Sequence, residues 1–433
     1  MRLEQRRALR IAAAVMFVIA YWYTKGILSS KNWERGSWQP LLVAAAFLAL
    51  ATWLAKCLQG GEQVPEKRSD RRETLLLGAC LFLQSLAFGL YPVHEDLIGI
   101  FQVLLWHGTA IFFVLSLAGM LADHRLGLLF PADAANGAFR IPFQNLFLRA
   151  KLLWGRREET ERPSGAAAQK TVILLLTGVA ALVLALFAAA ELSAASTSFA
   201  AIGDRIGLFF DGFSLRWLTQ DFLPYFIFSL PVGAYLFGLL GGSLLENPKV
   251  LTGENWRRKT ARLRAFPERS LLVVLGALAV VYAAFFALAG GWSGIFDLQG
   301  ISAWDACKSA VAGFWQLVRV MLLNFLVLLA SFVFGKEPAW AQKRARILAA
   351  VLLVFGLGFG FLAFWKLFVI YIGAFGPTPR RIFAGWVLLV LLFWDVLGLV
   401  RLKKNFRAAG IGLRAALVSF TVLALVPIET LCR

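Results

Sequence analysis

The stretch Thr171–Ala190 reads TVILLLTGVAALVLALFAAA and contains no ionisable side chain. About twenty apolar residues in an α-helix span the hydrocarbon core of a bilayer. Within lipid, every backbone N–H and C=O needs a partner from the chain itself, and a helix supplies all of them. The stretch therefore predicts a transmembrane helix, and runs of the same kind recur along the chain.

The composition extends this prediction to most of the protein. Of its 433 residues, 59% are hydrophobic and 16% are charged, and the mean hydropathy is +0.71. Soluble domains carry about 25% charged residues, so most of this chain is expected to lie out of contact with water. The alternating short segments that are typical of a transmembrane β-barrel are not found in the sequence.

Eleven segments have the length and apolar character of membrane spans. We predict a single membrane-embedded domain over residues 1–433, folded as an all-α, polytopic bundle of about eleven transmembrane helices. The first span is expected to be retained, because no small-residue cleavage site follows it. The predicted spans are 11–28, 38–58, 73–92, 97–122, 171–191, 222–245, 270–290, 310–334, 346–366, 382–400 and 409–428.

Basic residues indicate how the chain is oriented. The segments that are cytoplasmic when the N-terminus is inside hold 33 Lys and Arg residues, whereas the outer segments hold 10. Cytoplasmic loops of membrane proteins are enriched in Lys and Arg, so the N-terminus is predicted to be cytoplasmic. The net charge of +19 favours contact with anionic lipid headgroups. Nucleic-acid binding is not expected, because no basic patch has interleaved aromatic residues.

Two longer connections lie between the predicted spans. In the cytoplasmic loop 123–170, apolar residues recur at helical spacing from Phe143 to Trp154, and Arg149 is among the polar residues of the other side. This pattern predicts an amphipathic helix in the membrane interface, which could be a simple connector or a lipid-sensing or partner-binding element. The outer segment 192–221 is rich in Phe and Gly and is expected at the outer interface.

Motifs of common enzyme chemistry are not found. The sequence lacks the phosphate-binding G-x-x-x-x-G-K-[ST], the zinc-binding H-E-x-x-H and the nucleophile elbow G-x-S-x-G. We therefore predict no catalytic, metal-binding or cofactor-binding residues, and no cofactor. Gly356 and Gly360, and likewise Gly238 and Gly242, are four residues apart within apolar spans, which predicts close helix packing.

Polar side chains inside the spans are the first candidates for a functional site, because burying them in lipid is costly. The eighth span contains Gln316, Arg319 and Asn324, and the first two are three residues apart and share a helix face. Arg319 lies too deep to reach the interface easily, and Asp395 in the tenth span is its predicted partner. Such a pair would be either architectural or part of a path for protons or substrate.

A second candidate region is Trp365–Arg381, which reads WKLFVIYIGAFGPTPRR. Its residues Tyr371-Ile372-x-x-Phe375-Gly376-x-Thr378-x-x-Arg381 resemble the signature Y-I-x-x-[FY]-G-L-T-x-x-R of a bacterial family. That family is domain of unknown function 4153, which has a close relative numbered 4173. Pro377 stands where the family usually has Leu. Upstream, Gly313-Phe-Trp-Gln-Leu317 resembles the family's G-F-x-x-L segment.

The resemblance covers mainly residues 205–400, and what it implies is limited. It implies a multi-pass protein of the bacterial cytoplasmic (inner) membrane, and it brings no known activity, substrate or cofactor. It marks Tyr371, Gly376, Thr378 and Arg381 as positions to test, with Lys366 close by in the same stretch.

Local chemistry allows two interpretations of this motif. Gly376 and Pro377 are expected to end a helix, and Thr378 is expected to cap the next one. A helix N-terminus with Arg381 beside it can bind an anion. The other interpretation is a tight turn between two helices whose arginines anchor it at the lipid headgroups.

Three classes of function remain open. The first is a transporter or transport-accessory protein, which the intramembrane Arg319 and Asp395 favour. The second is a membrane-embedded enzyme that acts on a lipid-linked or anionic substrate near Thr378 and Arg381. The third is a membrane sensor or assembly factor that binds a protein partner through the 123–170 loop. The substrate is not indicated by any motif.

Overall fold

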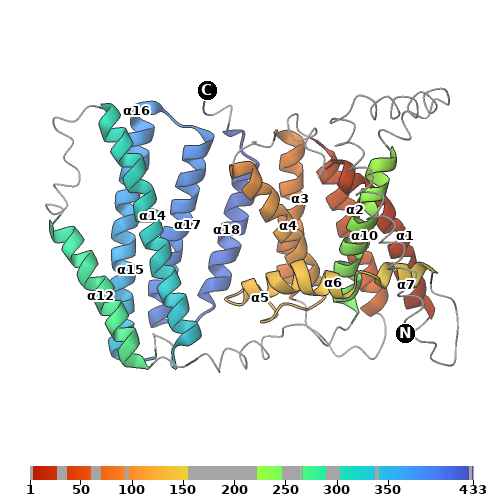
Figure 1. Cartoon of the computed structure of the whole chain (residues 1–433), viewed down its shortest axis with the longest axis horizontal. Coiled ribbons are helices and arrows are strands. Elements are labelled where there is room, and N and C mark those ends of the chain that lie inside the picture. The colour runs from red at the N-terminus through yellow and green to blue at the C-terminus, as the bar shows by residue number, and fades with distance from the viewer. Residues whose placement is uncertain are drawn as a thin grey trace, which may run out of the picture. The chain divides into compact units, whose positions relative to one another are not determined.

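The structure is a computed structural model that describes residues 3–26, 37–59, 70–92, 97–154, 222–245, 264, 267–288, 303–336, 341–428 and 432. The elements in this part of the chain are helices (Figure 1). The predicted span 171–191, the outer segment 192–221 and the end of the 123–170 loop lie outside the described residues.

Nine helices of the described residues are long and apolar enough to cross a membrane. One of these spans begins with α15, continues through the π-helix η4 (Trp365–Ile372) and ends with α16 (Gly373–Phe375), for a total of 33 residues. A further apolar helix, α18 (Ala408–Ala424), has 17 residues. The nine are α1 (Leu3–Gly26), α2 (Gln39–Gln59), α3 (Arg71–Leu90), α4 (Leu97–Leu117), α10 (Leu223–Leu244), α12 (Glu268–Leu288), α14 (Ala303–Phe334), α15 (Lys343–Phe364) and α17 (Pro379–Lys403).

These helices coincide with ten of the eleven predicted spans, and they fit a multi-pass membrane protein. The ninth and tenth predicted spans are both long enough to cross fully. The total of about eleven spans and the cytoplasmic N-terminus stay predictions.

The chain groups into two compact units. Unit 1 comprises residues 1–95, 103–120 and 133–250, and unit 2 comprises residues 96–102, 121–132 and 251–433. The single membrane-embedded domain over residues 1–433 stays a prediction from the sequence.

Unit 1 is built around α1, which packs against α2 and α10. The buried residues of α1 recur at helical spacing and are mostly small, so neighbouring helices can approach closely. The fully buried ones include Leu9, Ala12, Ala13, Met16 and Ala20.

The segment 130–154 of the predicted interfacial loop folds as a series of short helices. They are α5 (Phe130–Ala135), η2 (Asn136–Arg140), α6 (Ile141–Gln144) and α7 (Leu148–Trp154). Phe143 and Trp154 are 60% and 68% exposed, as expected of apolar side chains that meet the membrane interface.

Arg149 does not lie with the polar side of that segment but is buried within unit 1. Its Nε donates a hydrogen bond to the backbone oxygen of Ala13 at 3.1 Å, and its guanidinium carbon lies 3.5 Å from the centre of the Phe17 ring. Burial lowers the pKa of Arg149 to about 10, since desolvation disfavours its charged form. Arg149 therefore ties α7 to α1 instead of facing water.

The glycines of α10 allow this segment to pack closely, as the sequence predicts. A Cβ atom on Gly238 would lie 2.7 Å from the backbone oxygen of Pro142, and one on Gly242 would overlap the side chain of Asn145. Larger residues at these two positions would push α6 away from α10.

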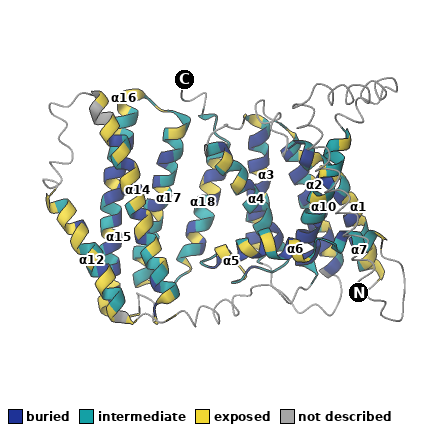
Figure 2. Ribbon diagram, viewed as in Figure 1, coloured by how far each residue is buried: buried dark blue, intermediate teal, exposed yellow. Residues whose placement is uncertain are grey.

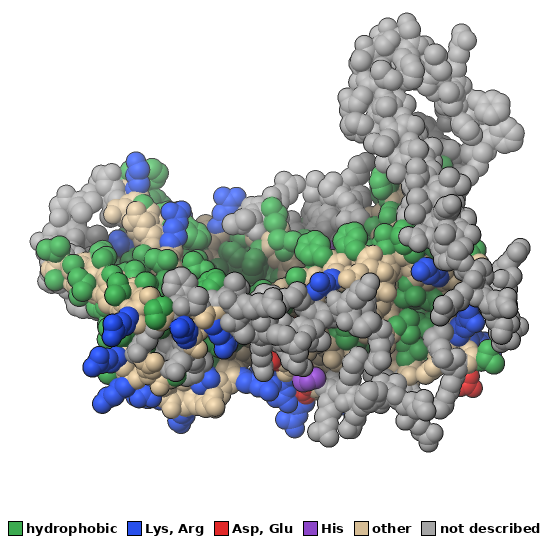
Figure 3. All heavy atoms as spheres, turned by 60° about the horizontal axis from the view of Figure 1, so that its bottom comes forward, with side chains coloured by type: hydrophobic (Ala, Val, Ile, Leu, Met, Phe, Trp, Pro, Cys, Tyr) green, Lys and Arg blue, Asp and Glu red, His purple; other side chains and the backbone are tan. Residues whose placement is uncertain are grey.

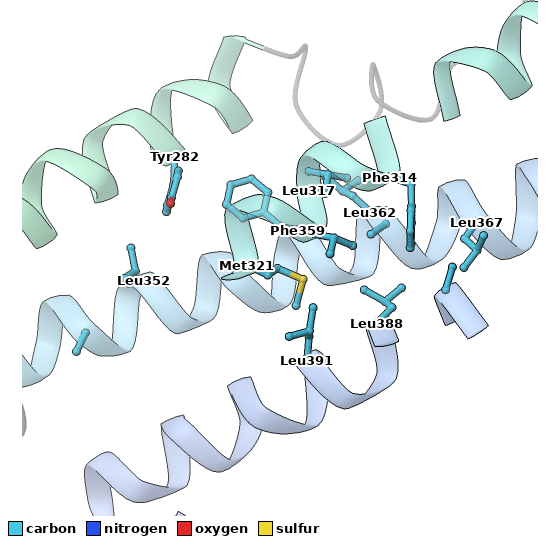
Figure 4. Packing of buried hydrophobic residues seen from close by; sticks show 14 of the residues in the cluster. Tyr282, Phe314, Leu317, Met321, Leu352, Phe359, Leu362, Leu367, Leu388 and Leu391 are labelled. Carbon is cyan, nitrogen blue, oxygen red and sulfur yellow. The ribbon is translucent and has the colours of Figure 1, made fainter. Parts of the chain in front are cut away.

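Unit 2 has α15 at its centre, with α12, α14 and α17 packed against it. Apolar side chains from all four helices form one core (Figure 4). The fully buried members of this core are Leu275, Met321, Ala349, Leu352, Ala363 and Leu388. Gly360 contributes to the close packing, because a Cβ atom there would meet both Leu392 of α17 and Met321 of α14.

Basic side chains gather at one end of unit 2, where α14 and α17 end and α15 and α18 begin (Figures 1 and 3). The exposed ones are Lys336, Lys343, Arg344, Arg346, Lys403, Lys404 and Arg407. This is the end that the sequence predicts to be cytoplasmic, and the gathering is the pattern expected of that side.

Lys366 lies inside a helical span, whereas the sequence predicts it as the last residue of the span 346–366. The helix runs on from α15 through η4 to Phe375. The reason is that apolar neighbours, including the buried Leu367, pack against the core of unit 2, and a single Lys does not end a helix that is stabilised by packing.

Candidate functional site

Asp395 of α17 is the most unusual side chain in the described part of unit 2. Its exposure is 0%, and neither of its carboxyl oxygens has a hydrogen-bond partner among the described residues. Buried carboxyl groups are normally hydrogen-bonded or paired, because leaving them unsatisfied is costly. This side chain therefore needs an explanation beyond packing.

The carboxyl group lies directly against α15. A Cβ atom built on Gly356 would stand 2.8 Å from Oδ2 and 2.9 Å from Oδ1 of Asp395. Real Cβ atoms are essentially never that close to another atom, so glycine at 356 makes the space that the carboxyl group occupies. The neighbouring Trp394 also has an indole N–H that is buried without a partner in the described residues.

Asn324 of α14 is a second fully buried polar residue in this unit. The hydroxyl of Tyr282 on α12 donates a hydrogen bond to its Oδ1 at 2.8 Å. Its Nδ2 lies 3.5 Å from the backbone oxygen of Leu352, which is at the outer limit of hydrogen-bond length. Figure 4 shows Tyr282 and Leu352 together at one end of the apolar core of unit 2.

The two polar groups meet α15 within one helical turn of each other. Asn324 reaches Leu352, and Asp395 reaches Gly356 four residues later. Four helices thus supply the site: α12 gives Tyr282, α14 gives Asn324, α15 gives the glycine and α17 gives the acid. We call these four residues the buried polar site.

Arg319 and Gln316 are not part of the buried polar site. Both are exposed, whereas Asn324 is buried, and no ion pair joins Arg319 to Asp395. The predicted pairing is therefore not made in this structure. The reason is helical geometry: Asn324 belongs to the stripe of α14 that packs on α15, and Arg319 belongs to the stripe that faces away.

Lys366 lies in η4, close to the family-like segment that begins at Gly313. The Cε and Nζ atoms of Lys366 are each 3.1 Å from the place where a Cβ atom on Gly313 would stand. Two segments that the sequence compares with one family are thus neighbours in space. A π-helix is rare and frequently marks a functional position.

The motif from Tyr371 to Arg381 forms the turn between α16 and α17. Gly376 ends the first helix with a φ of 74°, a conformation that favours glycine. Thr378 caps α17, since its Oγ1 accepts a hydrogen bond from the backbone N–H of Arg381 at 3.4 Å. Both features agree with the sequence prediction.

The guanidinium group of Arg381 makes its contacts within this turn. It donates to the backbone oxygen of Phe375 at 2.9 Å and to that of Gly376. Its Cζ lies 4.0 Å from the centre of the Tyr371 ring, which is a cation–π contact. These contacts favour the interpretation as a tight turn over that as an anion site.

Among the described residues, no group of three or more His, Cys, Asp or Glu side chains is placed to hold a metal ion. The buried polar site itself offers a carboxyl, an amide and a phenol.

Comparison with known proteins gives a family. A family sequence model described as "Domain of unknown function (DUF4153)" matches residues 73–432. The chain belongs to this family. The match confirms the family that the sequence resembles, and it covers more of the chain than 205–400. Family membership assigns no activity, and no curated protein and no solved structure matches the chain.

Sequence reasoning found two of the four residues in the buried polar site, Asn324 and Asp395. It missed Tyr282, because the phenol oxygen is a single polar atom within a largely apolar span. It took Gly356 as a packing residue only, although the side chain that packs there is Asp395. The available signal was the spacing of Leu388, Leu391 and Asp395, which places the acid on the buried face of α17.

Proposed function

We propose that the protein is a membrane transporter, or an accessory protein of one, in which Asp395 carries a proton. The observation that carries the proposal is the fully buried carboxyl group that lacks a hydrogen-bond donor within the described residues. Carboxyl groups within transmembrane helices commonly belong to proton or ion pathways. The multi-pass helical fold and the family are compatible with this function.

The energetics favour a bound proton over a bare carboxylate. Moving an ionised group out of water without a counter-ion costs on the order of several kcal/mol. No cationic side chain is in contact with Asp395 among the described residues, and Arg319 faces away from it. Binding a proton removes the charge, and releasing it requires access to water or to new hydrogen-bond donors.

The surroundings offer such donors after a small rearrangement. Asn324 supplies an amide that meets α15 at Leu352, one helical turn before Gly356, and Tyr282 supplies a phenol that is hydrogen-bonded to this amide. Rotation of either side chain towards Asp395 would exchange their mutual hydrogen bond for one to the carboxylate. A carrier needs two such states of similar free energy, one for each protonation state.

An apolar layer separates the carboxyl group from the other end of unit 2. Leu388 and Leu391 lie between Asp395 and the turn at Arg381 along α17, and Figure 4 shows both of them beside Met321 of α14. Ions would leak across the membrane through a continuous polar path. An apolar layer prevents this, because the protein must change conformation before a proton passes. This arrangement supports a carrier and not an open channel.

The first test is infrared difference spectroscopy of the full chain in lipid vesicles at acidic and alkaline pH. A protonated, buried Asp395 gives a carboxyl C=O band that is lost in Asp395→Asn. Since Asn is nearly isosteric and uncharged, this variant is expected to fold. The proposal is refuted if the spectra of the wild-type protein and the variant are the same in the carboxyl region.

The second test is proton movement into vesicles that contain a pH-sensitive dye, under an imposed membrane potential. Wild-type protein is expected to acidify the interior faster than Asp395→Asn does. Trp394→Phe, which removes the neighbouring unpartnered N–H but leaves the acid, is the matched control and should retain the flux. Loss of flux in the control with retention in Asp395→Asn would contradict the proposal.

A further inference from the structure

The face of α14 that points away from α15 carries a regular seven-residue pattern. Seven of its exposed residues are spaced alternately by four and three positions, and Figure 2 shows exposed residues along this helix. We call them the α14 seam: Lys308, Ala312, Trp315, Arg319, Leu322, Leu326 and Leu329. This spacing is the one that a helix uses to pack lengthwise against a second helix.

Arg319 sits near the middle of the seam and near the middle of the span. The span runs from Lys308 to Phe334, so Arg319 is eleven residues, or about 16 Å along the axis, from the Lys308 end. Gln316 lies one turn away on the same side. Neither side chain has a partner among the described residues, and both are exposed.

Lipid alone is a poor environment for this position. The leucines of the seam are suited to acyl chains, but a guanidinium group at this depth is not. The other face of α14 is already covered by α15 and η4. The seam therefore has the length and the spacing for a second helix to pack along it. It also carries the charge of Arg319, which acyl chains do not neutralise.

A second copy of the chain does not fit the seam well. Two copies related by a two-fold axis along the membrane normal would bring Arg319 towards Arg319, and like charges repel. Of the acids in the described spans, Glu4 lies in the first turn of α1, and Glu73 and Asp395 are both buried, so the described part of a second copy presents no carboxyl group to the seam at this depth. The occupant must bring its own acid.

We propose that the α14 seam binds a transmembrane helix of another membrane protein, and that this helix carries one Asp or Glu near the middle of the bilayer. The acid pairs with Arg319, and Gln316 hydrogen-bonds beside it. The leucines from 322 to 329 pack in the seam. This inference does not depend on the proton-carrying role of Asp395, because that side chain lies on the buried side of the bundle.

The test uses the full chain in lipid vesicles and a synthetic probe. The probe is a dye-labelled transmembrane peptide of Leu and Ala with a single Glu at its centre, and a second peptide has Leu there. Energy transfer to a dye on the protein measures binding. The Glu peptide is expected to bind wild-type protein about tenfold more tightly than the Leu peptide.

Variants locate the preference on the seam. Arg319→Leu, which lipid tolerates, should bind the two peptides equally, and Arg319→Lys should keep the preference for Glu. Lys308→Leu is the matched control, because it removes a seam cation at the end of the span and should leave the preference unchanged.

Three results would overturn the proposal. The first is equal binding of the Glu and Leu peptides to wild-type protein. The second is a preference that persists in Arg319→Leu. The third is self-association of the wild-type chain that Arg319→Leu abolishes, since the occupant would then be a second copy.

Discussion

Replacing Gly356 by Ala tests the close approach of Asp395 to α15. The new Cβ atom would stand 2.8 Å and 2.9 Å from the two carboxyl oxygens of Asp395 and 3.0 Å from Cγ. Ordinary van der Waals contact begins near 3.4 Å, so the whole carboxyl group must move by about half an ångström. It is short and fully buried, which leaves it little freedom to do so.

The magnitude follows from two opposing effects. Overpacking of a buried site costs about 1–3 kcal/mol, whereas Ala in place of Gly inside a helix stabilises by about 1 kcal/mol. Gly276 of α12 separates the two effects, because a Cβ atom there has nothing within 4 Å. Gly276→Ala should therefore be stabilising, and Gly356→Ala should be about 1–3 kcal/mol less stable than this control.

The assay is SDS-driven unfolding in mixed micelles, followed by circular dichroism. Combining Gly356→Ala with Asp395→Ala removes the colliding carboxyl group, so the penalty should vanish in the double variant. If Gly356→Ala is as stable as Gly276→Ala, or if the penalty survives without the carboxyl group, the proposed packing of Asp395 against α15 is wrong.

Three further predictions follow from contacts elsewhere. Tyr282→Phe should destabilise unit 2 by about 0.5–1.5 kcal/mol in the same unfolding assay, and should have a smaller effect when Asn324 is already Leu. Arg381→Lys should destabilise by about 1 kcal/mol, because Lys lacks the planar fork that stacks on Tyr371 and donates to two carbonyls; an unchanged midpoint would show that the turn does not need these contacts. Gly242→Val should detach the 130–154 segment from α10, because the new side chain collides with Asn145. Thermolysin should then cleave after residue 140 faster than in the control Gly108→Val, where a side chain has space.

The positions of the helices could be predicted from the sequence because lipid imposes one simple rule. A span needs about twenty apolar residues in a row, and that property is local. The turn at Gly376 and Thr378 was predictable for the same reason, since glycine conformation and threonine capping depend on residues close in the chain. Even so, the span that begins at Lys343 runs to Phe375, because tertiary packing carried the helix past Lys366.

Side-chain partners could not be predicted in this way. The pairing of Arg319 with Asp395 assumed that two charges inside the membrane must meet. Helical periodicity assigns each residue to a face but does not say which helix covers that face. The same limit concealed Tyr282, whose role depends on α12 lying beside α14 at the level of Asn324.

The direction of Arg149 was missed for a related reason. An arginine in an amphipathic pattern is expected to face water, yet a gap beside Gly233 on α10 admits its guanidinium group. Only the three-dimensional neighbourhood of α1 and α10 makes that position acceptable for a cation.

The π-helix η4 gives this span one place where the chain can lose a residue without turning. Each π-helical turn holds more residues than an α-helical turn, so η4 accommodates extra residues within one continuous helix. Deleting one apolar residue from the stretch, such as Val369, would let it relax towards α-helix, and the residues on either side would keep their rotational phase. The same deletion in the regular helix α15 would turn every later residue of that helix by about 100°. Single-residue deletions within η4 are therefore expected to be milder than deletions a turn or two earlier.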